Sequence, residues 1–177
     1  MRCFIGFFVP DEIKPQIVAA QNRLKHLPVV CKFVEDENLH ACISFLGEVS
    51  DEDVAKIAVK LENICKNHPK FRINVDGIKL IPNEKYLRVV GLDVSEESGI
   101  LKTLSSDIKN SIGGDCKPAH ITLCRVKNIV DKDKTVEKIK RIETEVDGFG
   151  VNSIDLIKSV VSRSGPIYTV VKSCKLA

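Results

Sequence analysis

The sequence predicts an α+β protein with two pseudo-symmetric lobes, each an antiparallel sheet with outer helices, facing each other across a central cleft. Strand-like and helix-like segments alternate along all 177 residues, and the order strand, helix, strand, helix, strand occurs twice. No glycine-rich phosphate loop follows any strand, which argues against a doubly wound parallel sheet. We therefore expect a single bilobal domain, residues 1–177, with approximate halves 1–80 and 81–177.

The first half begins with an apolar segment, 3–9, that we interpret as a strand and not as a signal peptide, because acidic residues follow at once. Asp11 is expected to start a helix, because apolar residues recur every three or four positions from Ile13 to Leu24. A second strand is expected at 40–46, and a helix with Ser50 as its N-cap follows it. Alternating apolar residues over 71–75 predict the third strand.

The second half repeats this order. Its helices are expected where apolar residues recur with helical spacing, at 95–112 and 135–146. The first of these helices ends at two consecutive glycines, which is typical of a helix C-terminus. The strands are expected at 86–94, 120–126, 151–161 and 167–174, the last two joined by a turn at 164–166.

Composition and charge exclude several classes of protein. The formal net charge is +3, which is far from the basic surface of a protein that wraps duplex nucleic acid. No apolar run approaches the roughly 20 residues that cross a bilayer, so we expect no membrane association. The seven cysteines are odd in number and form no Cys-x-x-Cys pair, which indicates reduced thiols. Because the N-terminus lacks a signal-peptide pattern, we expect a cytoplasmic location. We expect a monomer.

Two matched strands each open with a histidine, His40 and His120. Because side chains alternate along a strand, each histidine shares its face with small polar residues, while Phe45 is expected on the apolar, core-facing side. A lone strand histidine is usually structural, but two at equivalent places in a repeat favour acid–base catalysis. The residues expected to share the cleft face are His40, Cys42 and Ser44 in the first strand and His120, Thr122 and Cys124 in the second.

These segments support a resemblance to a known family. His-x-Thr-Leu-x-Arg-Val-Lys at 120–127 resembles the second signature of the two-histidine phosphoesterases, and His-x-Cys-Ile-x-Phe-Leu-Gly at 40–47 resembles the first. Met1-Arg2-x-Phe4-Ile5 and Gly165-Pro166-x-Tyr168 are similar to the branch called LigT-like RNA 2′,3′-cyclic phosphodiesterases. The similarity spans essentially the whole chain. The chain departs from the family at Cys42, where the first motif has Thr, and a thiol is a weaker hydrogen-bond donor.

The resemblance implies hydrolysis of a 2′,3′-cyclic phosphate at an RNA 3′ end, leaving a 2′-phosphate, without metal or cofactor. It implies His40 as proton donor and His120 as proton acceptor, with Thr122, Cys42 and Arg125 binding the phosphate. An imidazole suits either role because its unperturbed pKa lies near 6.5. The reverse reaction would join a cyclic phosphate to a 5′-hydroxyl, so the family also implies reversible 2′,5′ RNA ligation.

Two placements are left for the structure to decide. Strict alternation puts Arg125 on the face opposite His120, so a role in the cleft requires a β-bulge, a strand end or a side chain that reaches around from the rim. Tyr168 and Phe33 are candidate stacking platforms for the terminal base, although aromatic residues also serve as packing.

Three other readings remain open at this stage. His40, Cys42, His120 and Cys124 could together hold zinc. Cys42 could act as a nucleophile beside His40, although neighbours two apart on a strand lie roughly 6–7 Å apart. The chain could also be a non-catalytic module that binds RNA ends.

Overall fold

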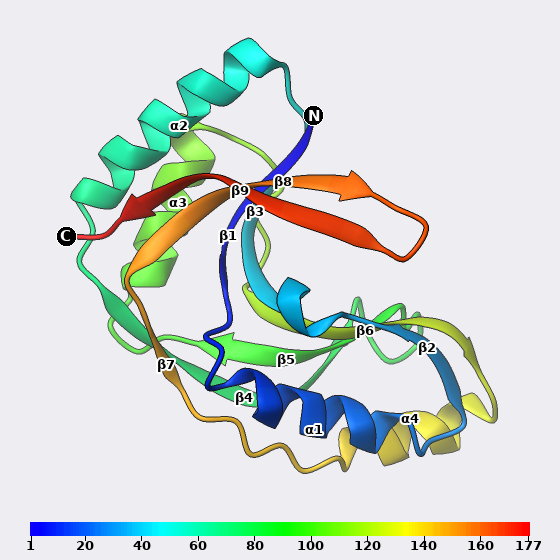
Figure 1. Cartoon of the computed structure of the whole chain (residues 1–177). Helices are drawn as coiled ribbons and strands as arrows, with labels where there is room; N and C mark the ends of the chain where they lie inside the picture. The colour runs from blue at the N-terminus through cyan, green and yellow to red at the C-terminus, as the bar shows by residue number, and fades with distance from the viewer.

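A computed structural model describes all residues, 1–177, and shows one strongly curled antiparallel sheet of nine strands with helices on its outer side (Figure 1). The strand order is β7-β4-β5-β6-β3-β1-β8-β9, and β2 pairs with β6. The strands are β1 (Arg2–Phe8), β2 (Val29–Phe33), β3 (His40–Glu48), β4 (Phe71–Ile81), β5 (Val89–Ser95), β6 (His120–Ile129), β7 (Phe149–Val151), β8 (Ser153–Val161) and β9 (Pro166–Lys175).

The α+β prediction of two antiparallel lobes is confirmed. One lobe is β3-β1-β8-β9 and the other is β6-β5-β4-β7 with β2, and the two meet where β3 pairs with β6 through Ala41 and Ile121. Each lobe takes strands from both ends of the chain, because β8 and β9 complete the lobe built on β1, whereas β2 joins the lobe built on β6. The halves 1–80 and 81–177 therefore describe the sequence pattern and not the lobes.

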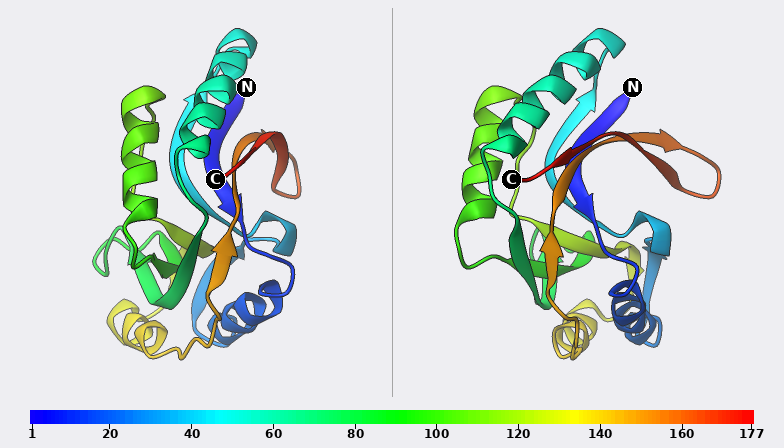
Figure 2. Two further views of the ribbon diagram at one scale, coloured as in Figure 1. Left: turned by 90° about the vertical axis from the view of Figure 1, so that its left-hand side faces the viewer. Right: turned by 60° about the vertical axis from the view of Figure 1, so that its left-hand side comes forward.

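Four α-helices cover the outer surface in two pairs (Figure 2). One pair, α2 (Asp51–Lys66) and α3 (Ile100–Ser111), packs together beside β3, β8 and β9. The other pair is α1 (Lys14–Leu24), which contacts β6, and α4 (Lys132–Lys140). The inner, concave face of the sheet stays free of helices. None of the helices combines the length and the apolar character that crossing a bilayer requires.

Most predicted elements form, and Ser50 caps α2 by accepting a hydrogen bond of 3.1 Å from the backbone N–H of Asp53. The predicted strand 151–161 is split at Asn152, because β7 pairs with β4 whereas β8 pairs with β1. Helix α3 begins at Ile100 and not at 95, since Gly99 at its N-terminus has a left-handed φ of 81° that interrupts the helix.

Two further differences concern local signals. Strand β2 was not predicted, because its five residues show only a short, half-buried alternation. The helix predicted at 135–146 is α4, which begins at Lys132 and ends at Lys140, where Arg141 is its C-cap. Element ends of this kind depend on tertiary contacts that a local pattern does not contain.

Candidate active site

The concave face contains a cavity of about 450 Å³ at the junction of the two lobes. Its walls come from β1, β2, β3, β6, β8 and β9 and from the segment 34–38 before β3. The predicted site residues His40, Cys42, His120, Thr122, Arg125, Phe33 and Tyr168 all line it. Side chains from segments more than 120 residues apart are thus brought into one space.

The two histidine strands each contain a β-bulge at the same place. Opposite β1, residue Gly6 pairs with Cys42 and Ile5 pairs with Ser44, so Ile43 is skipped. Opposite β5, Gly91 pairs with Thr122 and Val90 with Cys124, so Leu123 is skipped. A bulge adds one residue to a strand and therefore reverses which face every later side chain occupies.

This reversal answers the question about Arg125. The bulge at Leu123 returns Arg125 to the face of His120 and Thr122, and Arg125 lines the cavity. Of the placements that the sequence left open for Arg125, the structure shows the one beyond a β-bulge.

The bulge in β3 likewise places two side chains on the opposite face from the one expected. Phe45, expected in the core, is 38% exposed and lines the cavity, with the guanidinium of Arg2 5.0 Å from its ring centre. Ser44, expected on the cleft face, is buried, and its hydroxyl donates to the carbonyl oxygen of Gly113 at 2.8 Å. Strict alternation failed in both cases because the bulge at Ile43 shifts the phase.

Two glycines that the motif analysis overlooked make the bulges possible. A Cβ on Gly6 would lie 2.3 Å from the carbonyl oxygen of Ala41, and one on Gly91 would lie 2.9 Å from the carbonyl oxygen of Ile121. Ala41 and Ile121 are the residues that follow the two histidines. Both glycines therefore permit a close backbone approach beside a histidine strand. A glycine inside each first strand of the repeat was the available sequence signal.

Both imidazole rings are held in the same way. Nδ1 of His40 lies 2.7 Å from the carbonyl oxygen of Asn38, and Nδ1 of His120 lies 3.2 Å from that of Pro118. A carbonyl oxygen only accepts hydrogen bonds, so Nδ1 carries the proton in each neutral ring. Nε2 of each ring then has its lone pair free for proton exchange in the cleft.

Burial lowers the pKa of both histidines below the ordinary value. For His40 the carbonyl of Asn38 opposes this effect, while positive charge on His120 and Arg125 adds to it. His40 also packs against two aromatic rings, with centroid distances of 4.8 Å to Phe4 and 5.1 Å to Tyr168. Both rings are therefore neutral near pH 7 in the free protein. A bound phosphate anion would restore the proton affinity of one ring.

Cys42 faces the cavity as a protonated thiol. Burial, with smaller contributions from Cys116 and Asp115, raises its pKa to about 12. A thiol that stays protonated at neutral pH is a poor nucleophile and a weak hydrogen-bond donor. This environment argues against the reading in which Cys42 attacks the substrate.

The predicted four-residue zinc site is not assembled. Cys124 is fully buried and does not line the cavity, because the bulge at Leu123 turns it toward the core. Its thiol interacts with that of Cys31 on β2. It therefore cannot join His40, Cys42 and His120 around one ion.

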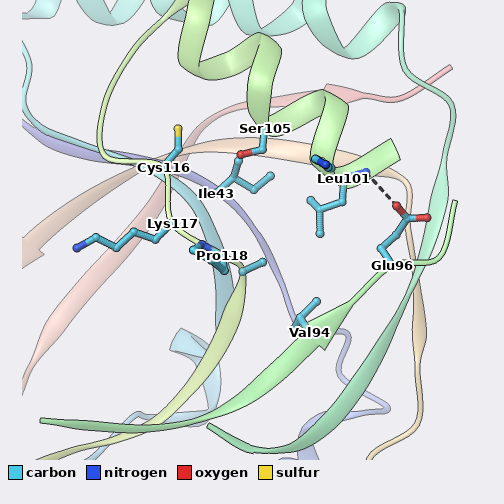
Figure 3. A pocket seen from close by; sticks show the side chains of 10 residues that line it. Ile43, Val94, Glu96, Leu101, Ser105, Cys116, Lys117 and Pro118 are labelled. Carbon is cyan, nitrogen blue, oxygen red and sulfur yellow. Dashed lines mark hydrogen bonds between the residues drawn. The ribbon is translucent and has the colours of Figure 1, made fainter. Parts of the chain in front are cut away.

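A second cavity, of about 360 Å³, lies behind the histidine strands between α3 and the segment before β6 (Figure 3). Its lining is mixed: apolar side chains such as Ile43, Val94 and Leu101 share it with the charged Glu96, Lys102 and Lys117, and Ser105 and Cys116 lie at one side (Figure 3). Neither His40 nor His120 lines it. The paired imidazoles identify the concave cavity as the candidate active site.

The comparisons with known proteins agree with this geometry. Residues 7–91 match the family described as LigT like Phosphoesterase. A Methanocaldococcus jannaschii protein named RNA 2′,3′-cyclic phosphodiesterase is 32% identical, covering 97% of this chain and 99% of the relative. A protein of the same name from Aquifex aeolicus is 31% identical, covering 97% and 95%. The crystal structure of E. coli LigT in apo form has a TM-score of 0.75 and 25% identity, covering 99% and 97%.

A curled antiparallel sheet whose two central strands present histidines to one cleft is the architecture of a two-histidine phosphoesterase. The extent of the sequence match defines the branch: this chain belongs to the LigT-like phosphoesterase family.

Proposed function

We infer that this protein hydrolyses 2′,3′-cyclic phosphates at RNA 3′ ends to 2′-phosphomonoesters. The inference rests on the pair of imidazoles, which line one cavity and are each held through Nδ1 by a backbone carbonyl. The curated relatives bear the name of this activity. Structures of E. coli LigT complexed with phosphate and with 3′-AMP support an anionic nucleotide ligand for this fold.

We propose that His120 is the general base and His40 the general acid. Nε2 of neutral His120 accepts a proton from the attacking water as its oxygen bonds to phosphorus. Protonated His40, whose ring is charged once the phosphate anion is bound, donates its proton to the departing 3′-oxygen. The P–O3′ bond breaks and the 2′-phosphate remains. Solvent exchange then resets both rings. Each role contributes typically about 10² to 10⁴ in rate.

We propose that three further side chains stabilise the phosphate. Thr122 donates its hydroxyl hydrogen to a phosphate oxygen, and Arg125 offsets the charge that grows in the transition state. Cys42 occupies the place equivalent to Thr122, with a weaker donor. Tyr168 and Phe33 line the same cavity, where their rings can stack on the terminal base of the RNA.

The site needs only one chain, since every wall of the cavity is supplied by this polypeptide. We therefore propose that it acts as a monomer. The seven free cysteines suit the reducing cytoplasm, which we propose as its location.

The experiment is product analysis on a short oligonucleotide ending in a 2′,3′-cyclic phosphate. The wild type should give a 2′-phosphate, and His40→Ala or His120→Ala should each lower the rate at least about a hundredfold. His26→Ala is the matched control, because His26 is exposed and does not line the cavity. A 3′-phosphate product, or undiminished turnover in either variant, would refute the proposal.

The same assay tests two related activities. Binding of the oligonucleotide without turnover would support a module that only recognises RNA ends. Addition of a second oligonucleotide with a 5′-hydroxyl tests 2′,5′ ligation, in which the two histidines exchange roles by microscopic reversibility.

A further inference from the structure

We propose that Lys79 and Asp93 form a positioning pair that holds His120 in its neutral, proton-accepting form and makes the two histidines inequivalent. The inference rests on the proposed function and extends it to residues outside the two motifs. Asp93 stabilises the imidazolium that forms when His120 takes the proton of water. Lys79 offsets the charge of the same carboxylate, so that the ring does not take up a proton from solvent before the reaction begins.

The register of the sheet places this pair beside His120. Asp93 on β5 is the direct partner of His120 on β6, and Lys79 on β4 is the partner of Gly91. Directly opposed side chains lie on the same face, with Cβ atoms about 4.5–5.5 Å apart. Nζ of Lys79 lies 2.8 Å from Oδ1 of Asp93, so the two side chains form an ion pair.

Gly91 leaves the path between Lys79 and the ring open. It lies between Lys79 on β4 and Thr122 on β6 in the pairing of the three strands. A Cβ on Gly91 would lie 3.5 Å from Cδ2 of His120. The absence of a side chain at this position lets the ion pair and the imidazole interact without an intervening group.

The equivalent position beside His40 carries no charge. Phe8 on β1 is the direct partner of His40, as Asp93 is of His120, and the two rings are 6.3 Å apart between centroids. The chain thus places a hydrophobic ring beside the proposed acid and an ion pair beside the proposed base. The residues that create this difference lie outside both histidine motifs.

The charged groups that face His120 come from each neighbouring strand. They are Asp93 from β5, Lys79 from β4, Arg125 on β6 itself and His40 from β3. Burial is the largest influence that lowers the pKa of His120; the Pro118 carbonyl raises it, Lys79 lowers it, Asp93 raises it and Arg125 lowers it. The pair Lys117–Asp115, on the segment before His120, is turned to solvent, with side chains 72% and 58% exposed.

A competing role for Lys79 is direct contact with an RNA phosphate. That role would weaken substrate binding and raise KM, while the pH dependence of the base would stay unchanged. The two roles are therefore separable by kinetics.

The experiment measures the pH profile of kcat/KM for the wild type, Lys79→Gln, Asp93→Asn and the double variant. Protonation of the base produces the acidic limb of this profile. Lys79→Gln leaves Asp93 unopposed, stabilises the imidazolium and should move that limb up by about half a pH unit. Asp93→Asn leaves Lys79 unopposed and should move the limb down by a similar amount. The double variant should return close to the wild type.

Three further measurements test whether the shifts come from the charges of this pair. Lys79→Arg, which keeps the charge, should restore the wild-type limb. Lys56→Gln removes an exposed ion pair on α2, with Glu52 at 2.7 Å, and should leave the limb in place. NMR titration of the His120 ring should give the same opposite shifts for the two single variants without any substrate.

The inference would be overturned if neither single variant shifts the acidic limb of the pH profile or the NMR titration of His120. It would also be overturned if Lys79→Gln only raises KM. If the wild type fails to turn over a cyclic phosphate, the proposed function fails. The NMR titration still decides whether the pair controls the proton affinity of His120.

Discussion

Strands β3 and β6 can be compared position by position, because both begin with a histidine and both are bulged three residues later. Each histidine donates Nδ1–H to the carbonyl two residues before it. Each bulge faces a glycine on the neighbouring strand, Gly6 or Gly91. The shared backbone geometry brings two imidazoles to one cavity.

The side chains at equivalent positions differ. Cys42 occupies the place of Thr122, and Phe45 the place of Arg125. A pair with identical surroundings would have identical proton affinities, and neither ring would be specialised as acid or base. The comparison teaches that the backbone creates the site, whereas the unequal side chains give its two ends different chemistry.

The largest effect should come from breaking the shared backbone. Gly6→Ala forces a Cβ against a backbone oxygen at 2.3 Å and should lower the free energy of unfolding by about 3 kcal/mol. Gly91→Ala meets its oxygen at 2.9 Å and should cost about 1 kcal/mol. Urea denaturation measures both values.

Gly77→Ala is the matched control, because nothing lies within 4 Å of a Cβ added on this β4 glycine. Equal stability of Gly6→Ala and Gly77→Ala would show that the close approach at β3 is not required.

A smaller effect should come from the helix position behind each strand. Gln21 on α1 is buried, and its Nε2 donates to the carbonyl oxygens of Val34 at 2.9 Å and Leu123 at 3.0 Å. On α3, Ser105 lies beside the second cavity (Figure 3). Gln21→Ser should leave two carbonyls unpaired and open a similar cavity in the first half. We expect a loss of about 2 kcal/mol in urea denaturation.

Ser105→Gln is the reciprocal change and should cost much less, because the second cavity has room for the longer side chain. Equal losses for the two changes would show that the second cavity does not accommodate the longer side chain.

The smallest effect should come from giving position 42 the same residue as position 122, since both side chains are proposed to bind the phosphate. Cys42→Thr introduces a better donor into a strand position that accepts a β-branched residue, and kcat/KM should rise about two- to fivefold. Cys42→Ala, which has no donor, should give a lower kcat/KM than the wild type. Steady-state kinetics on the cyclic-phosphate oligonucleotide measures both. Complete loss of activity in Cys42→Thr would instead favour a cysteine nucleophile.

The patterns that succeeded were those that depend on nearby residues. Helical spacing predicted α1 and α2, and the Ser50 cap followed from the first turn of its own helix. The histidine pair followed from a repeat in the sequence. The failures at Phe45, Ser44 and Cys124 share one cause, because each lies beyond a bulge that reverses strand alternation.

The sequence by itself determined the α+β class, the two histidine strands and their assignment to one site, because periodicity and motif spacing are local properties of the chain. Only the tertiary structure decided the register. A bulge is set by the strand alongside, here through glycines at positions 6 and 91. The exchange of strands between lobes and the ion pair beside His120 likewise join residues distant in sequence. No local pattern contains such pairings, because strand register is a joint property of two segments.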